Sequence, residues 1–293
     1  MTRLPSLRVV YGHHKCATGW ITEIMRECAF HLGLRHDIVH LPSDIAPHGN
    51  LGGRVATRQP DLLFYTNATH AQARTLPAHR GVHVVRDPRD VLVSAYFSHL
   101  RSHPTDEWPA LQPHRAALQA ADKDEGLLLE LAFSQDVFDA MAAWDYGQAH
   151  VLELKMEVLT AAPLDGFTQI ADFFGWLDAP AGGVRKTVRQ AQLRWNRLSH
   201  KGKRLTGGWP LLPLPRRRLA SMPHDQLVRI LEAKSFKKLS GGRARGEEKR
   251  SSHYRKGVPG DWANHFTPAV TDAFKARYGD LLVRLGYASN QSW

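Results

Sequence analysis

Short apolar runs alternate along this chain with longer segments of helical periodicity. The runs at 8–11, 61–70, 81–86 and 151–155 are rich in β-branched, leucine or aromatic residues, and 37–41 is a weaker run of the same kind. Runs of this length and composition are typical of buried strands. We therefore expect these segments to form the strands of a sheet.

Helical segments and loops separate the predicted strands. Segments that we expect to be helical occupy 20–32, 126–146, 184–204, 224–232 and 271–285. Stretches interrupted by glycine or proline, which we expect to be loop insertions in a single domain spanning 1–293, occupy 42–60, 103–125 and 200–218.

The segment 7–20 combines a strand, a loop that begins at Gly12 and the start of a helix. A loop before a helix N-terminus presents backbone N–H groups without partners, and Lys15 adds a positive charge beside them. This pattern favours phosphate binding. It differs from the nucleotide-triphosphate loop, Gly-x-x-x-x-Gly-Lys-Ser/Thr, because Lys15 follows Gly12 by only three residues. An ordinary turn with an exposed lysine is the alternative.

Positive charge is concentrated in the C-terminal half. The 293 residues carry a net charge of +11, yet 185–218 alone carries +11 and 234–256 carries +7, so the remainder is at −7. A uniform positive coat would indicate general nucleic-acid affinity, whereas two basic windows beside a phosphate loop favour a highly anionic small ligand. We therefore expect no nucleic-acid partner. A solvated basic face is the alternative interpretation.

Two cysteines, Cys16 and Cys28, are too few for a disulfide framework or a cysteine-only metal site. The histidines at 13, 14, 31, 36 and 40 fit no standard ligand spacing, so we expect no metal. No apolar run reaches membrane-spanning length, and a strand follows within a few residues of Met1, which leaves no room for a signal peptide. We expect a soluble, cytoplasmic protein without a membrane partner.

A second anion-binding pattern follows the strand at 81–86. Arg86 ends this strand, and Ser94 lies eight residues later in a helix predicted to begin at Asp87-Pro88. A guanidinium offers two donors to phosphate oxygens, and a hydroxyl adds a third contact. A salt bridge from Arg86 to Asp87 or Asp90 is the alternative.

These two patterns together resemble the sulfotransferases, which move a sulfuryl group from 3′-phosphoadenosine 5′-phosphosulfate (PAPS). The string at 84–97 resembles their 3′-phosphate-binding segment, and 15–20 resembles their 5′-phosphosulfate loop. The string at 255–267, Arg-Lys-Gly-Val-Pro-Gly-Asp-Trp-Ala-Asn-His-Phe-Thr, matches the family's Arg-Lys-Gly-x-x-Gly-Asp-Trp-Lys-Asn-x-Phe-Thr signature except at Ala263. Ser235-Phe236 resembles the element whose aromatic ring packs on adenine.

The resemblance implies an α/β fold, namely a P-loop-like, three-layer α/β/α arrangement around a central, mostly parallel sheet. It implies transfer of a sulfuryl group from PAPS, as donor co-substrate, to a hydroxyl or amine. The residues that it implies for PAPS binding are Lys15, Cys16, Ala17, Thr18, Gly19, Trp20, Arg86, Ser94, Ser235, Phe236, Arg255, Lys256 and Gly257. Met156 stands where the family often has a tyrosine near the nucleotide.

The resemblance also implies catalytic roles. Lys15 would stabilise charge on the leaving phosphate, and Ser94 would interact with Lys15 and restrain early cleavage. His70 matches the histidine of the family's Lys-Thr-His motif, with Ala68 in place of the lysine, and would be the base; His99 is the reserve candidate.

Several alternatives stay open at the sequence level. Trp20 is expected to sandwich the adenine with Phe236; the alternative is that it only anchors the first helix. For His70 the alternative is a capping or surface histidine with no catalytic role. A P-loop-type kinase, and a nucleotide- or polyanion-binding protein without catalysis, are the competing functions. The basic segment 185–218 favours an anionic acceptor such as a glycan, whereas Trp209 and its leucines suit an apolar alcohol or phenol.

Overall fold

The structure is a computed structural model that describes residues 6–106, 108–178, 184–205, 217–249 and 255–293. These residues form two compact units. The sheet unit comprises the described residues of Met1–Gly12, Ala17–Val84 and Tyr146–Lys234, and the helical unit comprises those of His13–Cys16, Val85–Asp145 and Ser235–Trp293.

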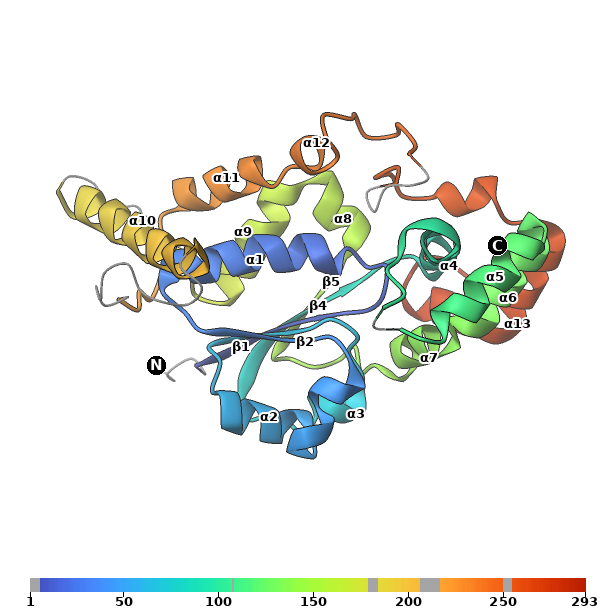
Figure 1. The fold of residues 1–293 in the computed structure, drawn as a ribbon, viewed down its shortest axis with the longest axis horizontal. Coiled ribbons are helices and arrows are strands. Elements are labelled where there is room, and N and C mark those ends of the chain that lie inside the picture. The colour runs from blue at the N-terminus through green and yellow to red at the C-terminus, as the bar shows by residue number, and fades with distance from the viewer. Residues whose placement is uncertain (1–5, 107, 179–183, 206–216, 250–254) are drawn as a thin grey trace. The chain divides into compact units, whose positions relative to one another are not determined.

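The sheet unit is built on a five-stranded sheet of order β2-β3-β1-β4-β5 (Figure 1). Its strands are β1 (Leu7–Gly12), β2 (His36–Val39), β3 (Leu62–Tyr65), β4 (His79–Val85) and β5 (Val151–Lys155). Central β1 pairs in parallel with β3, where Val10 lies opposite Phe64, and with β4, where Val10 lies opposite Val82. The predicted α/β class with a mostly parallel sheet is confirmed.

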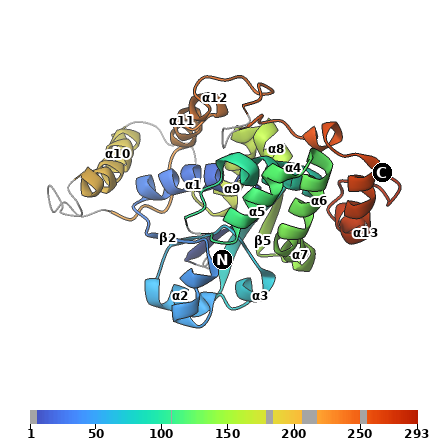
Figure 2. The same cartoon turned by 45° about the vertical axis from the view of Figure 1, so that its right-hand side comes forward.

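The two faces of this sheet follow from the alternation of side chains along each strand. Val10, Phe64 and Val82 share one face and belong to a continuous core with α1 and α9. The helices that contribute to this core are α1 (Thr18–Leu32), α8 (Met156–Ala161), α9 (Pro163–Phe173), α10 (Val184–Leu205) and α11 (His224–Ala233). On the other side of the sheet lie α2 (Leu51–Arg58) and α3 (His70–Ala73) (Figures 1 and 2).

The helical unit consists of short helices around α6. Its elements are α4 (Pro88–Phe97), the π-helical turn η3 (Ser98–Ser102), α5 (Leu111–Ala120), α6 (Lys123–Phe133), α7 (Gln135–Ala143), α12 (Phe236–Leu239), the 3-10 turn η4 (Asp261–Asn264) and α13 (Pro268–Arg284). Helix α6 contacts α4, α5 and α13. Within the described segments, no helix has both the length and the apolar composition needed to cross a bilayer.

Four segments differ from the sequence-based expectations. The strand expected at 61–70 ends at Tyr65, and His70 begins α3. The single helix expected at 126–146 is broken at Ser134, whose hydroxyl donates to the Glu130 carboxylate. The stretch 42–60, expected to be a loop insertion, contains α2. A Cβ at Gly52 in this helix would lie 2.2 Å from the carbonyl oxygen of Thr75, so this glycine reflects a close contact and not a turn. The stretch 103–125 contains α5, which buries only two residues and so has a weak apolar pattern. Of the stretch 200–218, residues 206–216 lie outside the described residues.

Candidate functional site

The loop after β1 has an uncommon backbone. Lys15 (φ 64°) and Ala17 (φ 57°) both adopt the left-handed region, which non-glycine residues rarely enter. Between them, Cys16 is buried, and its N–H donates to the carbonyl oxygen of His13 at 3.1 Å. Strained backbone of this kind concentrates at ligand-binding sites, where the surrounding structure imposes it.

Arg86 lies directly beside this loop in the helical unit. Its Nη1 donates to the carbonyl oxygen of Lys15 at 3.1 Å. The side chain is 8% exposed, and its Nε is buried without a hydrogen-bond partner in the described part of the chain. A buried N–H that lacks a partner is costly, and an anionic ligand would satisfy it.

The salt-bridge alternative for Arg86 is not seen among the described residues, because both candidate carboxylates have other partners. Asp87 accepts from the Arg89 guanidinium at 2.7 Å. Asp90 accepts backbone N–H groups, from Gly260 at 2.7 Å and from Trp262 at 2.9 Å. Among the described residues the Arg86 guanidinium forms no ion pair with either acid, although its charge opposes the burial effect that raises the pKa of Asp90.

Positive charge converges on Lys15. Burial and the neighbouring Arg86 guanidinium lower the pKa of Lys15 from 10.5 to about 8, with a smaller contribution from Arg255 and with Glu130 opposing them. The lowered pKa means that the protein alone does not fully compensate the ammonium charge. A phosphate or sulfate group at this position would do so.

Helix α4 holds the other predicted residue of this segment, Ser94. Asp87 caps the helix by accepting from the Arg89 N–H at 2.9 Å, and Pro88 occupies its first turn. Every residue from Pro88 to Phe97 is buried except Ser94, which is half-buried. The hydroxyl of Ser94 is thus at the accessible edge of an otherwise enclosed helix.

The 255–262 segment is organised around a carboxylate, Asp261. Asp261 accepts from Arg255 and from Lys256, both at 2.5 Å. Burial alone raises the pKa of Asp261, but the hydrogen bonds from Lys256 and Arg255 outweigh burial, so its pKa is lowered overall. Arg255 also lies over the Phe97 ring, 4.7 Å from its centre.

Gly257 allows the backbone of this segment to lie against Phe236. Its φ is +70°, and a Cβ built there would lie 2.7 Å from Cε2 of Phe236. Phe236 itself is half-buried at the start of α12, directly after Ser235, the residue that precedes the helix. The structure therefore brings together the aromatic ring and the glycine that the sequence assigned to one nucleotide.

The remaining predicted residues belong to the sheet unit. Thr18 and Gly19 begin α1, and Trp20 follows them. The Trp20 Nε1 donates to the carbonyl oxygen of Lys234 at 2.9 Å, and its ring packs edge-on against Phe167 with centroids 5.3 Å apart. These contacts anchor α1, as the alternative interpretation of Trp20 expected; its adenine contact stays a prediction.

His70 begins α3, just beyond the end of β3, and is half-buried. Two residues before it, the Ala68 N–H donates to the carbonyl oxygen of Gly12 at 2.9 Å, which fixes this turn at the carboxyl end of β1. Ligands of open α/β sheets bind at this edge. Met156, where the family often has tyrosine, packs against the core of the sheet unit.

A histidine cluster in the helical unit was missed at the sequence level. His14, which precedes Lys15, lies 3.0 Å from His99 between their Nε2 atoms, and the buried Glu130 accepts from His99 Nδ1 at 2.9 Å. Residues so far apart in sequence give no spacing signal. The i, i+4 pair of His99 and His103 was the only available indication, and it falls on a π-helical turn.

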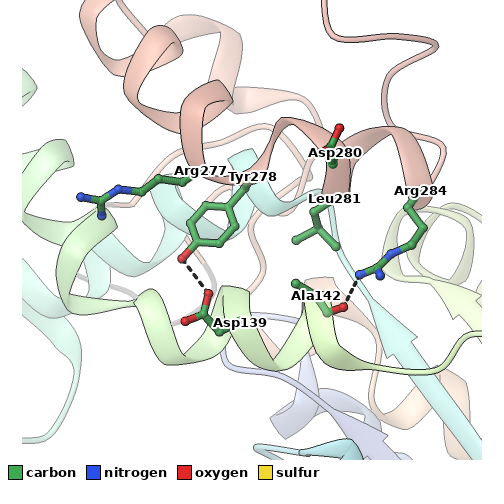
Figure 3. A pocket seen from close by; sticks show the side chains of 7 residues that line it. All are labelled: Asp139, Ala142, Arg277, Tyr278, Asp280, Leu281 and Arg284. Carbon is green, nitrogen blue, oxygen red and sulfur yellow. Dashed lines mark hydrogen bonds between the residues drawn. The ribbon is translucent and has the colours of Figure 1, made fainter.

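A pocket of about 230 Å³ lies between α7 and α13 (Figure 3). Tyr278 donates to Asp139 at 3.1 Å on one side, and Arg284 donates to the carbonyl oxygen of Ala142 at 2.5 Å on the other. None of the residues that line this pocket belongs to the predicted site.

One family model matches part of the chain. Residues 218–286 match the family model described as the sulfotransferase domain. This segment includes Phe236 and the Arg255-Lys256-Gly257 string. No curated protein matches the sequence.

Solved structures extend the similarity to most of the chain. Mouse sulfotransferase SULT7A1 complexed with PAP has 16% identity and a TM-score of 0.52, over 95% of this chain and 85% of that one. Retinol dehydratase in complex with androsterone and the inactive cofactor PAP has 14% identity and a TM-score of 0.47, over 96% and 82%. The chain therefore has the fold of a sulfotransferase, and its residues 218–286 match the sulfotransferase domain.

Proposed function

We propose that this chain is an enzyme that transfers a sulfuryl group from PAPS to a hydroxyl or amine of an acceptor. The observation that carries the proposal is the Arg86 guanidinium, buried beside Lys15 with its Nε unpartnered within the described residues. Asp90 joins the same helix to the 255–262 segment through two backbone hydrogen bonds. Arg86, Ser94, Arg255, Lys256 and Gly257 would then hold the 3′-phosphate.

Lys15 is proposed to act on the leaving group. In this displacement the acceptor oxygen or nitrogen bonds to sulfur as the bond from sulfur to the 5′-phosphate oxygen breaks, and 3′,5′-bisphosphoadenosine (PAP) leaves. Negative charge grows on that phosphate oxygen, and a positioned ammonium stabilises charge most where it develops. The Lys15 ammonium would donate to this oxygen, with the amides of 16–19 around the 5′-phosphate. Ser94 would restrain Lys15 until the acceptor is bound.

His70 is the proposed base that takes the acceptor's proton. Its place beyond β3, at the carboxyl edge of the sheet, supports this role. His99 is the second candidate, because the hydrogen bond from its Nδ1 to Glu130 would orient the ring and stabilise the imidazolium. Turnover by His70→Ala and His99→Ala separates the two: the variant that loses turnover while retaining PAP affinity identifies the base.

The acceptor is proposed to be a small molecule or a glycan. An anionic glycan would use the basic segment 185–218, part of which lies outside the described residues, as does Trp209 of the apolar alternative. Incubation with labelled PAPS and a panel of sugars, phenols, sterols and peptides tests both classes. Labelled product on any member supports the proposal.

PAP binding separates the proposed enzyme from its competitors. We expect calorimetric binding of PAP without magnesium and no equivalent binding of ATP with magnesium. A kinase would show the reverse preference. A polyanion binder would bind heparin with steep salt dependence and would not prefer PAP. Either of these two results would contradict the sulfotransferase assignment.

A further inference from the structure

Three imidazoles from two segments of the chain converge in the helical unit. They belong to His14 in the loop after β1, His99 in η3 and His103 at the end of η3. One ring nitrogen from each lies within 4.8 Å of the other two. The ring centres of His14 and His99 are 5.1 Å apart, those of His14 and His103 are 5.3 Å apart, and those of His99 and His103 are 5.5 Å apart.

This triangle has the dimensions of a three-histidine metal site. With Zn–N bonds of about 2.0–2.1 Å at tetrahedral angles, neighbouring imidazole centres are separated by about 5 Å and neighbouring ligand nitrogens by about 3.3 Å. The His14 and His99 Nε2 atoms are 3.0 Å apart. A direct hydrogen bond explains the closeness of His14 and His99, but it does not explain why the His103 imidazole completes a nearly equilateral triangle with them.

The hydrogen bonds of two rings select the nitrogens that would bind an ion. His99 directs Nδ1 at Glu130, and His103 directs Nδ1 at the carbonyl oxygen of Pro104, 2.8 Å away. These acceptors place the proton on Nδ1 and therefore the lone pair on Nε2 of each ring. A carboxylate or carbonyl behind the ligating imidazole is the arrangement that fixes histidine ligands around metals.

Glu130 is the carboxylate that lies behind the His99 imidazole and fixes its orientation. It is fully buried and accepts from His99, from His114 at 2.9 Å and from the Ser134 hydroxyl. Because its oxygens are occupied by these donors, Glu130 suits a supporting role more than direct ligation.

The backbone around the cluster is also held in place. Arg115 of α5 donates to the carbonyl oxygens of His99 at 2.6 Å and of His103 at 2.5 Å. Trp108 forms an aromatic wall, with its ring centre between 5.1 and 5.8 Å from each of the three imidazoles. His14 and His103 are half-exposed, which gives an ion access from solvent.

We infer that His14, His99 and His103 bind a divalent transition-metal ion, with Zn²⁺ as the ion that three imidazoles and one solvent ligand suit best. Glu130 positions His99 for this purpose. The site goes beyond the proposed sulfuryl transfer, which requires no metal. An ion bound there would occupy the Nε2 lone pair of His99, so His99 could not then accept the acceptor's proton, and His70 would be the remaining candidate base.

Zinc binding by the purified full-length chain tests the inference directly. The protein is prepared without a histidine tag, stripped with dipicolinate and titrated with ZnCl₂ by calorimetry. We expect one Zn²⁺ per chain, and we expect Co²⁺ to give the visible absorption bands of a four-coordinate nitrogen site. A wild-type chain that binds neither ion would overturn the inference.

Variants assign the ligands. His103→Ala, at a half-exposed position, and His14→Ala should each abolish the four-coordinate Co²⁺ spectrum, and Glu130→Gln should weaken Zn²⁺ binding by about 10- to 100-fold. His48→Ala removes a half-buried histidine of the sheet unit and should bind Zn²⁺ as the wild type does. Circular dichroism checks the fold of each variant. If folded His103→Ala and His14→Ala both retain wild-type affinity, the ligand set is wrong.

Discussion

Lys15 owes its distinctive chemistry to its surroundings. A left-handed backbone holds it between His14 and Cys16, and burial beside Arg86 lowers its pKa to about 8. An ordinary lysine stays charged far above neutral pH, whereas this one loses its proton just above it. The proposed role in stabilising the leaving phosphate requires the ammonium form.

Sulfuryl transfer should therefore decline at mildly alkaline pH. As pH rises through about 8, the free enzyme loses the Lys15 proton, so kcat/KM for PAPS should fall there and not near the ordinary value of 10.5. Lys15→Arg keeps a permanent charge and should lack this decline, although its geometry lowers the rate. Lys15→Ala should lower kcat more than it weakens PAP binding. A wild-type profile that stays flat to about pH 10 would argue against the role of Lys15.

Arg86 gives the second prediction at this scale. Arg86→Ala removes a buried guanidinium with an unpartnered Nε, so PAP affinity should fall by about 10- to 100-fold, the value of one or two charge-assisted hydrogen bonds. Arg101→Ala, at an exposed position of η3, is the matched control and should bind PAP normally. Calorimetry with PAP measures both. Equal affinities would remove Arg86 from the proposed 3′-phosphate site.

The sequence indicated individual site residues only where they stand in a short motif. Lys15, Arg86 and Gly257 stand in such motifs, and Arg86 contacts the carbonyl oxygen of Lys15. The common ligand assigned to these residues stays a prediction.

Asp90 and Glu130 were not predictable. Asp90 accepts from Gly260, 170 residues away, and Glu130 accepts from His99, 31 residues away. No local sequence pattern indicates that a buried carboxylate accepts several hydrogen bonds from such distant residues.

At the scale of elements, α4 and the 255–262 segment behave as one assembly. The Asp90 carboxylate on α4 accepts the N–H groups of Gly260 and Trp262, and the Arg89 guanidinium lies over the Trp262 ring, 3.9 Å from its centre. Burial raises the pKa of Asp90, while Arg86 and the two amides oppose this. Arg86 and Arg255 are thereby positioned by shared supports and not by separate loops.

The contact between Gly257 and Phe236 gives a prediction for this assembly. In Gly257→Ala the new Cβ meets the Phe236 ring at 2.7 Å, so the ring must move and PAP affinity should fall by about tenfold or more. Gly241→Ala is the matched control, because Gly241 has a similar φ of +76° but no atom within 4 Å of its Cβ position. Both variants place an alanine at a similar positive φ, so the difference between their PAP affinities reports the contact with the Phe236 ring.

Calorimetry with PAP on the two variants measures that difference, and Phe236→Ala provides a second test. In the Phe236→Ala background, Gly257→Ala should have a much smaller effect, because the obstructing ring is absent. If Gly257→Ala and Gly241→Ala weaken PAP binding equally, the clash with Phe236 plays no part in nucleotide binding.

Strands and helices were predictable where the spacing of apolar residues and the length of the segment indicated the same element. Four of the five strands were found near their observed bounds, because each is a compact apolar run; the run at 61–70 forms a strand only over Leu62–Tyr65. Helices α2 and α5 were missed: α2 contains two glycines that close contacts require, and α5 buries only Leu111 and Leu118. The break at Ser134 was missed because the apolar spacing continues across it, whereas a polar hydrogen bond to Glu130 accompanies the interruption.

At the scale of the whole molecule, residues assigned to nucleotide binding or catalysis belong to both units. Lys15, Arg86 and Arg255 are in the helical unit, and Trp20 and His70 are in the sheet unit. The single domain expected over 1–293 stays a prediction, since it depends on whether the two units unfold together. Ligand-dependent unfolding of the full chain addresses that question and the identity of the ligand in one experiment.

PAP should stabilise the full chain against thermal unfolding, and AMP should do so far less. A ligand that binds only the folded state at 100 times its Kd contributes about 2.7 kcal/mol. AMP lacks the 3′-phosphate that Arg86 and Arg255 are proposed to hold, so at equal concentration its effect should be small. Scanning calorimetry measures the shift and, by comparing calorimetric with van't Hoff enthalpies, whether the units unfold as one.

The Arg86→Ala variant completes this test. The difference between its unfolding shifts with PAP and with AMP should be smaller than in the wild type, because Arg86 supplies part of the proposed 3′-phosphate contacts. ATP with magnesium serves as the competing ligand, and a larger shift with it than with PAP would favour a kinase. A single transition that PAP moves as a whole would indicate that the two units unfold together, as one cooperative domain requires.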